Sequence, residues 1–178
     1  MKRASKSAPK LVVLDNSDPI LAETEAIQSR IRQRAFVLSQ TRPPDANEIY
    51  DWIVAESEII SVPPAELIEK DSMFEVKFAV AGVNGNDVNV MVTPDQVLLK
   101  SEFSHEHDAD TGTVHLCDFR SATVFRSVNL PQPIDVKSVK IDLSDGMVTV
   151  SASKRGAEES RPPRRKAPIR KTSRSRMP

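Results

Sequence analysis

The chain has 178 residues, of which 39% are hydrophobic and 28% charged, so it can bury one core of ordinary size but not two full domains. Its single cysteine, Cys117, excludes an intramolecular disulfide and is typical of a reducing compartment. No apolar run approaches the roughly 18 residues that span a membrane, and we therefore expect a soluble, cytoplasmic protein with no membrane partner.

The formal net charge is zero, but the charges are unevenly distributed. Residues 1–10 carry four basic and no acidic residues, and residues 155–178 carry nine basic and two acidic residues. The body between them, residues 11–154, has 12 basic and 23 acidic residues and a net charge of −11. An acidic body with two basic ends can bind copies of itself, or it can bind polyanions through the ends.

Residues 1–17 are predicted to form a disordered basic N-terminus, because they show no apolar period. Asp18 and Pro19 then resemble a helix N-cap followed by a proline in the first turn. The helix is expected to end before Pro43. Its apolar positions recur at helical spacing: Ile27, Ile31, Ala35 and Leu38.

Asp45, followed three residues later by Glu48, resembles a capping box for a second helix that stops before Pro63. Its predicted apolar stripe consists of Ile49, Trp52, Ile53 and Ile60. Two short amphipathic helices over residues 18–61 form a hairpin that cannot bury both stripes by itself. The hairpin must therefore pack on the following domain, on another copy of the chain or on a partner.

From residue 62 the apolar period changes to two, which is typical of half-buried strands. Asp145-Gly146 is a signal for a tight hairpin turn. Because short strands follow one another without helices, residues 62–154 are predicted to form an immunoglobulin-like antiparallel β-sandwich, making the protein mainly β. Residues 155–178 are predicted to be a flexible basic tail. The expected strands include residues 74–80, 88–92, 97–99, 139–143 and 148–152.

The connection between Lys100 and Thr123 is long for a hairpin, at roughly 20 residues. Val114–Cys117 within it could form a short strand that pairs with the edge of another chain. Beyond it, Arg126 shares a strand face with apolar residues, where an unpaired charge is costly. Arg126 is therefore either an ion-pair anchor inside an interface or a side chain that reaches solvent.

Four motifs follow one another in the β region: Ala81-Gly82-Val83, Val97-Leu98-Leu99, Val124-x-Arg126-x-Val128-x-Leu130-Pro131 and Asp145-Gly146-Met147-Val148. In this order and spacing they resemble the alpha-crystallin domain of the small heat-shock proteins. Ala81 stands in place of the family's usual proline, and valines replace aromatic residues in the third motif. The helical hairpin resembles a small uncharacterised bacterial module, and that likeness implies no function.

The resemblance implies an ATP-independent chaperone of the stress response, a holdase that binds partly unfolded client proteins. It also implies a dimer formed by strand exchange, with interface residues Val114, His115, Leu116, Cys117 and Arg126. Most relatives carry an Ile-x-Ile clip in the tail, where this chain has only Ala167-Pro168-Ile169, so assembly beyond the dimer stays open. The expected client-binding residues are apolar positions of the hairpin: Ile27, Ile31, Leu38, Trp52 and Ile53.

One group of residues, His105, His107, His115 and Cys117, has side chains that zinc accepts. The alternative is a solvated acidic loop that contains histidines, and since no spacing fixes a tetrahedral set we predict no metal and no cofactor. No nucleophile elbow, phosphate-binding glycine loop or H-E-x-x-H motif occurs, so we expect no enzyme.

Two other functions remain open from the sequence. The sandwich could be the scaffold of a protein-interaction or adaptor module, or the basic tail could bind polyanions. The absence of a base-reading motif disfavours nucleic acid as the main partner.

Overall fold

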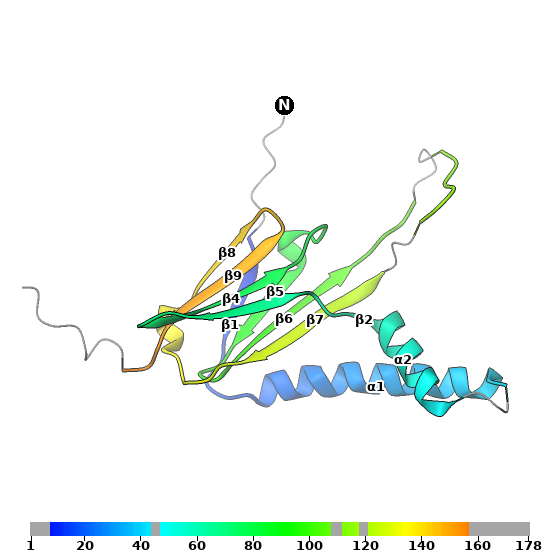
Figure 1. The fold of residues 1–178 in the computed structure, drawn as a ribbon, viewed down its shortest axis with the longest axis horizontal. Coiled ribbons are helices and arrows are strands. Elements are labelled where there is room, and N and C mark those ends of the chain that lie inside the picture. Colours follow the sequence, from blue (N-terminus) through cyan, green and yellow to red (C-terminus); the bar gives the residue numbers. More distant parts are fainter. Residues whose placement is uncertain (1–7, 44–46, 108–111, 118–120, 157–178) are drawn as a thin grey trace, which may run out of the picture.

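The computed structural model describes residues 8–43, 47–107, 112–117 and 121–156. Two β-sheets pack face to face, and two helices precede most of the strands (Figure 1). This confirms the predicted mainly β sandwich with an N-terminal helical hairpin. The elements are β1 (Lys10–Val13), α1 (Asp18–Thr41), α2 (Glu48–Ile59), β2 (Ile60–Ser61), β3 (Ala65–Glu69), β4 (Met73–Ala79), β5 (Val88–Val92), β6 (Gln96–Phe103), β7 (Ala122–Asn129), β8 (Lys140–Ser144) and β9 (Met147–Ser153), with short 3-10 turns at Gly85–Asp87 and Val136–Ser138.

The main core lies between the sheets, which have strand orders β1-β5-β6-β7-β2 and β3-β4-β9-β8. On β4, Phe74, Val76 and Phe78 are buried, and the residues between them are only partly buried. Because successive side chains of a strand point to opposite faces, this alternation places every second residue in the core. Burial of each such side chain contributes about 1.5–3 kcal/mol to stability.

The first strand corrects the prediction of disorder for residues 1–17, since Lys10–Val13 form β1 and pair in parallel with β5. Leu11 packs against the main core, and the β1 backbone covers the outer edge of β5. The four residues of β1 are too few to show an apolar period in the sequence. They form a strand because they pair with the edge of β5. Residues 1–7 and most of the tail, residues 157–178, lie outside the described residues.

Helix α1 lies along the outer side of β6 and β7 (Figure 1). Its Glu23 carboxylate lies 2.8 Å from the Lys100 ammonium on β6, and its Arg30 donates a hydrogen bond of 3.0 Å to the Thr123 hydroxyl on β7. Of the packing alternatives that the sequence left open, the structure therefore has α1 packed on its own chain. Within the described part of the chain, neither helix is long and apolar enough to cross a membrane.

Helix α2 buries a different face from the one predicted. Ile49 and Ile53 are 63% and 60% exposed, whereas Asp51 and Ala55 are buried against α1. Arg42, at the end of α1, lies 3.0 Å from the Asp51 carboxylate, and this ion pair holds the polar face of α2 inward. The cap is also different, because the Asn47 side chain accepts from the Ile49 amide, while Asp45 lies outside the described residues.

A second ion pair, between Arg34 and Glu58, joins the two helices at a more exposed position. The hydrogen bond from Arg34 to the Glu58 carboxylate, together with the charge of that carboxylate, raises the pKa of the Arg34 guanidinium above its usual value. Both ion pairs connect α1 to α2, so the hairpin is held by charge at its two sides and by apolar contacts between them.

The turn between β8 and β9 has a backbone that favours glycine. Gly146 has a φ of 73°, and a Cβ added there would lie 3.1 Å from the Ala81 Cα. Its carbonyl accepts a hydrogen bond of 2.7 Å from the Val80 amide. Gly146 thus lets two segments distant in the sequence approach closely.

Substitution of Gly146 by alanine is expected to lower the free energy of unfolding by about 1–3 kcal/mol, because both the positive φ and the contact with Ala81 oppose a side chain. Denaturant unfolding measures this loss. Gly156→Ala is the matched control, since Gly156 has a φ of 85° but no atom within 4 Å of its added Cβ. A loss at Gly146 no larger than at Gly156 would contradict the role given to the Ala81 contact.

Candidate functional site

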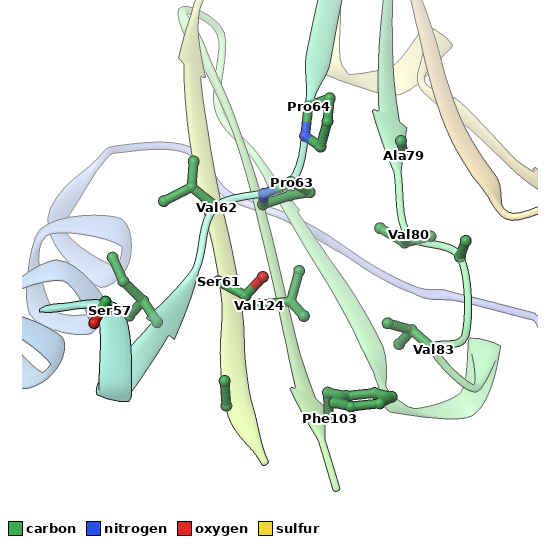
Figure 2. A pocket seen from close by; sticks show the side chains of 13 residues that line it. Ser57, Ser61, Val62, Pro63, Pro64, Ala79, Val80, Val83, Phe103 and Val124 are labelled. Carbon is green, nitrogen blue, oxygen red and sulfur yellow. The ribbon is translucent and has the colours of Figure 1, made fainter. Parts of the chain in front are cut away.

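An open apolar groove of about 520 Å³ lies where the two sheets separate beside the linker that follows β2. Figure 2 shows the linker residue Pro63 above Val124 of β7, with Val80, which follows β4, to the right of both. Phe103, at the end of β6, closes the lower part of the groove in this view. The groove therefore presents side chains of both sheets to one ligand or partner segment.

The structure brings some of the motif residues together at this groove. Ala81 and Val83 line it, and Gly146 contacts Ala81 from the neighbouring turn. Gly82, with a φ of 85°, makes the bend between them. Leu130 and Pro131 lie elsewhere: the Leu130 amide donates to the Asp95 carbonyl, and Pro131 is exposed.

Exposed apolar residues continue from the groove onto the helical hairpin. Phe36 and Trp52 line one hollow between the helices, and Ile53, Ile60 and Val62 line a second. Ile60 and Val62 also line the groove, so the second hollow joins it, whereas the first hollow shares no lining residue with the other two. We call these five residues the apolar track. Most of their side chains are exposed, and exposed apolar residues gathered on one part of a protein are typical of a binding surface.

The predicted client-binding residues divide between the track and the protein interior. Trp52 and Ile53 are 48% and 60% exposed and belong to the track. Ile27 and Ile31 are buried between the helices and β7, so their prediction as a surface is wrong for the folded chain. Leu38 is partly buried in the same cluster. Its neighbour in the sequence, Phe36, was missed because it lies off the predicted stripe.

The connection between β6 and β7 extends away from the sandwich as a long arm (Figure 1). Val114 is 41% exposed and Leu116 is 80% exposed, and Cys117 is exposed as well. Within the described stretch 112–117 no residue belongs to a strand, so the predicted strand at Val114–Cys117 is absent in the single chain. A strand forms only where an extended segment pairs in register with a neighbouring strand, and residues 112–117 are not part of such a ladder.

Arg126 lies on β7 between Val124 and Val128 and opposite Leu99 of β6. Its Nε is buried and has no hydrogen-bond partner among the residues that the structure describes. On the other side of β7, β2 pairs only with Thr123 and Val124. The strand edge beside Arg126 is therefore not covered by β2. The buried Nε–H group of Arg126 can still donate a hydrogen bond.

Two histidines and the cysteine meet at the base of the arm. The Cys117 Sγ lies 3.3 Å from the His105 Nε2, and the rings of His105 and His107 meet edge to face with centroids 4.8 Å apart. His115, which the sequence had grouped with them, is not part of this cluster. The predicted tail clip, Ala167-Pro168-Ile169, lies outside the described residues.

A family model described as "Hsp20/alpha crystallin family" matches residues 66–170, more than half of the chain. The chain belongs to this family. The small heat-shock proteins are chaperones, and the sandwich described above is their alpha-crystallin domain. The match begins inside β3, so β1, α1, α2 and β2 precede the family region.

Individual relatives are distant. An alpha-crystallin of Mycobacterium tuberculosis is 29% identical over 105 residues, which are 58% of this chain and 68% of the relative. Spore protein SP21 of Stigmatella aurantiaca is 26% identical over 94 residues, covering 53% of this chain and 56% of that protein. Among solved structures, heat shock protein 16.0 of Schizosaccharomyces pombe is similar with a TM-score of 0.49 and 22% identity over 53% of this chain and 87% of that chain.

Proposed function

We propose that this small heat-shock family member is an ATP-independent holdase of the cytoplasm, which binds partly unfolded proteins and keeps them from aggregating. The observation that carries the proposal is the apolar track, because it offers exposed apolar side chains on the hairpin and, through Ile53, Ile60 and Val62, hydrophobic surface that runs from α2 into the groove. A partly unfolded client exposes apolar side chains that such a surface can cover. Binding of this kind needs no catalytic group and no nucleotide.

The charge pattern supports the same proposal. Acidic residues dominate the body of the chain, residues 11–154, which has a net charge of −11. The apolar track is bordered at its first hollow by Arg32, Arg42 and Glu48. Like charges on separate complexes repel one another, so the acidic body would keep complexes of the protein and its client from associating with one another.

Light scattering of a heat-labile client, without nucleotide, tests the holdase. We expect the wild-type chain to suppress scattering at an equimolar ratio, and Trp52→Ser/Ile53→Ser to lose at least half of that suppression. Leu21→Ser/Val37→Ser is the matched control, because both residues are more than 50% exposed on α1 but lie outside the track. Unchanged scattering with the wild-type chain would refute the holdase, and equal losses in both variants would refute the track.

The fluorescence of the single tryptophan gives a second readout of the same surface. Trp52 is the only tryptophan and is 48% exposed. Client binding over the track is expected to shift its emission to shorter wavelengths, because the indole leaves water. A saturable shift with one native protein, and no protection of varied clients, would instead favour an adaptor module.

We further propose that two chains form a dimer by exchange of the arm residues Val114–Cys117. The described part of the arm, residues 112–117, is exposed and belongs to no strand, while β3 is the edge strand of its sheet and begins just after the linker residues that line the groove. An edge with unpaired backbone groups accepts a strand from another chain. In this arrangement a carboxylate of the partner would accept from the buried Nε of Arg126.

A further inference from the structure

The base of the arm holds three metal-ligating side chains whose donor atoms all lie within 4.8 Å of one another: His105, His107 and Cys117. His105 and His107 follow β6 on the outgoing limb of the arm, and Cys117 lies on the returning limb. Residues two apart in an extended segment point to the same side, which places both imidazoles toward the thiol. The cluster is thus built from two limbs that are separated by the tip of the arm.

These distances suit a tetrahedral transition-metal ion. Zinc binds imidazole nitrogen at about 2.0–2.1 Å and thiolate sulfur at about 2.3 Å, so their separation in a tetrahedron is about 3.6 Å. The Cys117 Sγ and His105 Nε2 are 3.3 Å apart, and the third donor lies within reach of the same centre. Nitrogen and sulfur donors favour zinc over magnesium or calcium, which prefer oxygen ligands.

Contrary to our expectation from the sequence, we propose that His105, His107 and Cys117 bind one Zn²⁺ per chain, with the fourth position open to water or another ligand. The ion joins the outgoing and returning limbs and so holds the arm in one conformation at its base. Because the ligands come together only when the arm is folded back, binding stabilises that conformation by mass action. The site is independent of client binding, and its failure would leave the proposed holdase function untouched.

The exposed thiol makes the site measurable without activity, since Cys117 is the only cysteine. Titration of the full chain, without a histidine tag, with Co²⁺ in place of Zn²⁺ should give ligand-field bands typical of tetrahedral cobalt and a thiolate charge-transfer band. Calorimetry with Zn²⁺ should give one ion per chain. Bound Zn²⁺ should also slow alkylation of Cys117 by a thiol reagent.

Matched variants separate this site from adventitious binding. Cys117→Ser should abolish the charge-transfer band, and His107→Gln should raise the dissociation constant for Zn²⁺ at least tenfold. His115→Gln is the control, because His115 lies on the same arm outside the cluster, and it should bind like the wild-type chain. Absence of the tetrahedral spectrum, or an equal effect of His107→Gln and His115→Gln, would overturn the proposal. Thermal unfolding followed by circular dichroism checks that each variant is folded.

Discussion

Replacement of Arg42 by methionine is expected to lower the free energy of unfolding by about 3 kcal/mol, because it leaves a buried carboxylate without its counter-charge. The Asp51 side chain is only 8% exposed and lies 3.0 Å from the guanidinium of Arg42, which is itself 20% exposed. The partial exposure of Arg42 places the expected loss at the lower end of the range for buried pairs. Denaturant unfolding of the single variant measures it.

The double variant Arg42→Met/Asp51→Leu removes both charges, and so distinguishes the cost of losing the ion pair from the cost of leaving the Asp51 carboxylate buried and unpaired. It should recover most of the lost stability, since two apolar residues of similar size can replace a buried ion pair. Arg34→Met is the control for a helix-bridging pair, because its side chain is 40% exposed, and it should cost much less. Equal losses in the Arg42 single and double variants would contradict this account of α2.

Arg126→Leu is expected to raise the dissociation constant of the proposed dimer by about 10- to 100-fold, since a hydrogen bond to a charged group contributes about 1.5–3 kcal/mol. The stability of the monomer should not fall, because the buried Nε has no acceptor within the described chain and leucine removes that unsatisfied donor. Sedimentation equilibrium measures the first effect, and denaturant unfolding at low protein concentration measures the second.

The control for removal of a positive charge is Lys140→Leu, since Lys140 is exposed on β8, in the other sheet from Arg126. It should leave the dissociation constant unchanged. A wild-type chain that stays monomeric at all concentrations would refute the dimer. A destabilised Arg126→Leu monomer with an unchanged dissociation constant would instead give Arg126 a role within its own sandwich.

The sandwich could be predicted because strands and tight turns each have a signal within a few consecutive residues. Side chains alternate along β4 and β5, and Asp145-Gly146 has the turn conformation that its residue types favour. The alternation of apolar and polar residues recurs in several strands, because each strand buries one of its two faces in the core. The motif residues at Ala81-Gly82-Val83 and Gly146 meet in space for the same reason.

The helical hairpin could be predicted as an element but not in its orientation. Apolar residues occupy more than one side of α2, so the pattern favoured Ile49 and Trp52 as the buried stripe. The buried face was instead selected by the Arg42–Asp51 pair and by Ala55, whose small side chain allows α1 to approach. Such a pairing between two helices has no local signal in the sequence.

The cluster at the base of the arm illustrates the same limit. The sequence indicates the residue types, but the spacing alone grouped His115 with Cys117 on one strand face. In the structure no strand forms there, and the return of the chain brings Cys117 to His105 instead. The contact depends on how the two limbs of the arm lie against each other, which a local period cannot encode.

The contacts of α1 also determine the order in which the protein can fold. Arg30 and Thr123 are 93 residues apart in the sequence, and Glu23 and Lys100 are 77 apart. At a synthesis rate of about 5–20 residues per second, α1 waits roughly 4–19 s for its partner strands β6 and β7 to be made. The hairpin therefore cannot dock before β6 and β7 have been made, and until then Ile27 and Ile31 lack their cover from β7. During its own synthesis the protein presents the kind of apolar surface that we propose it binds in others.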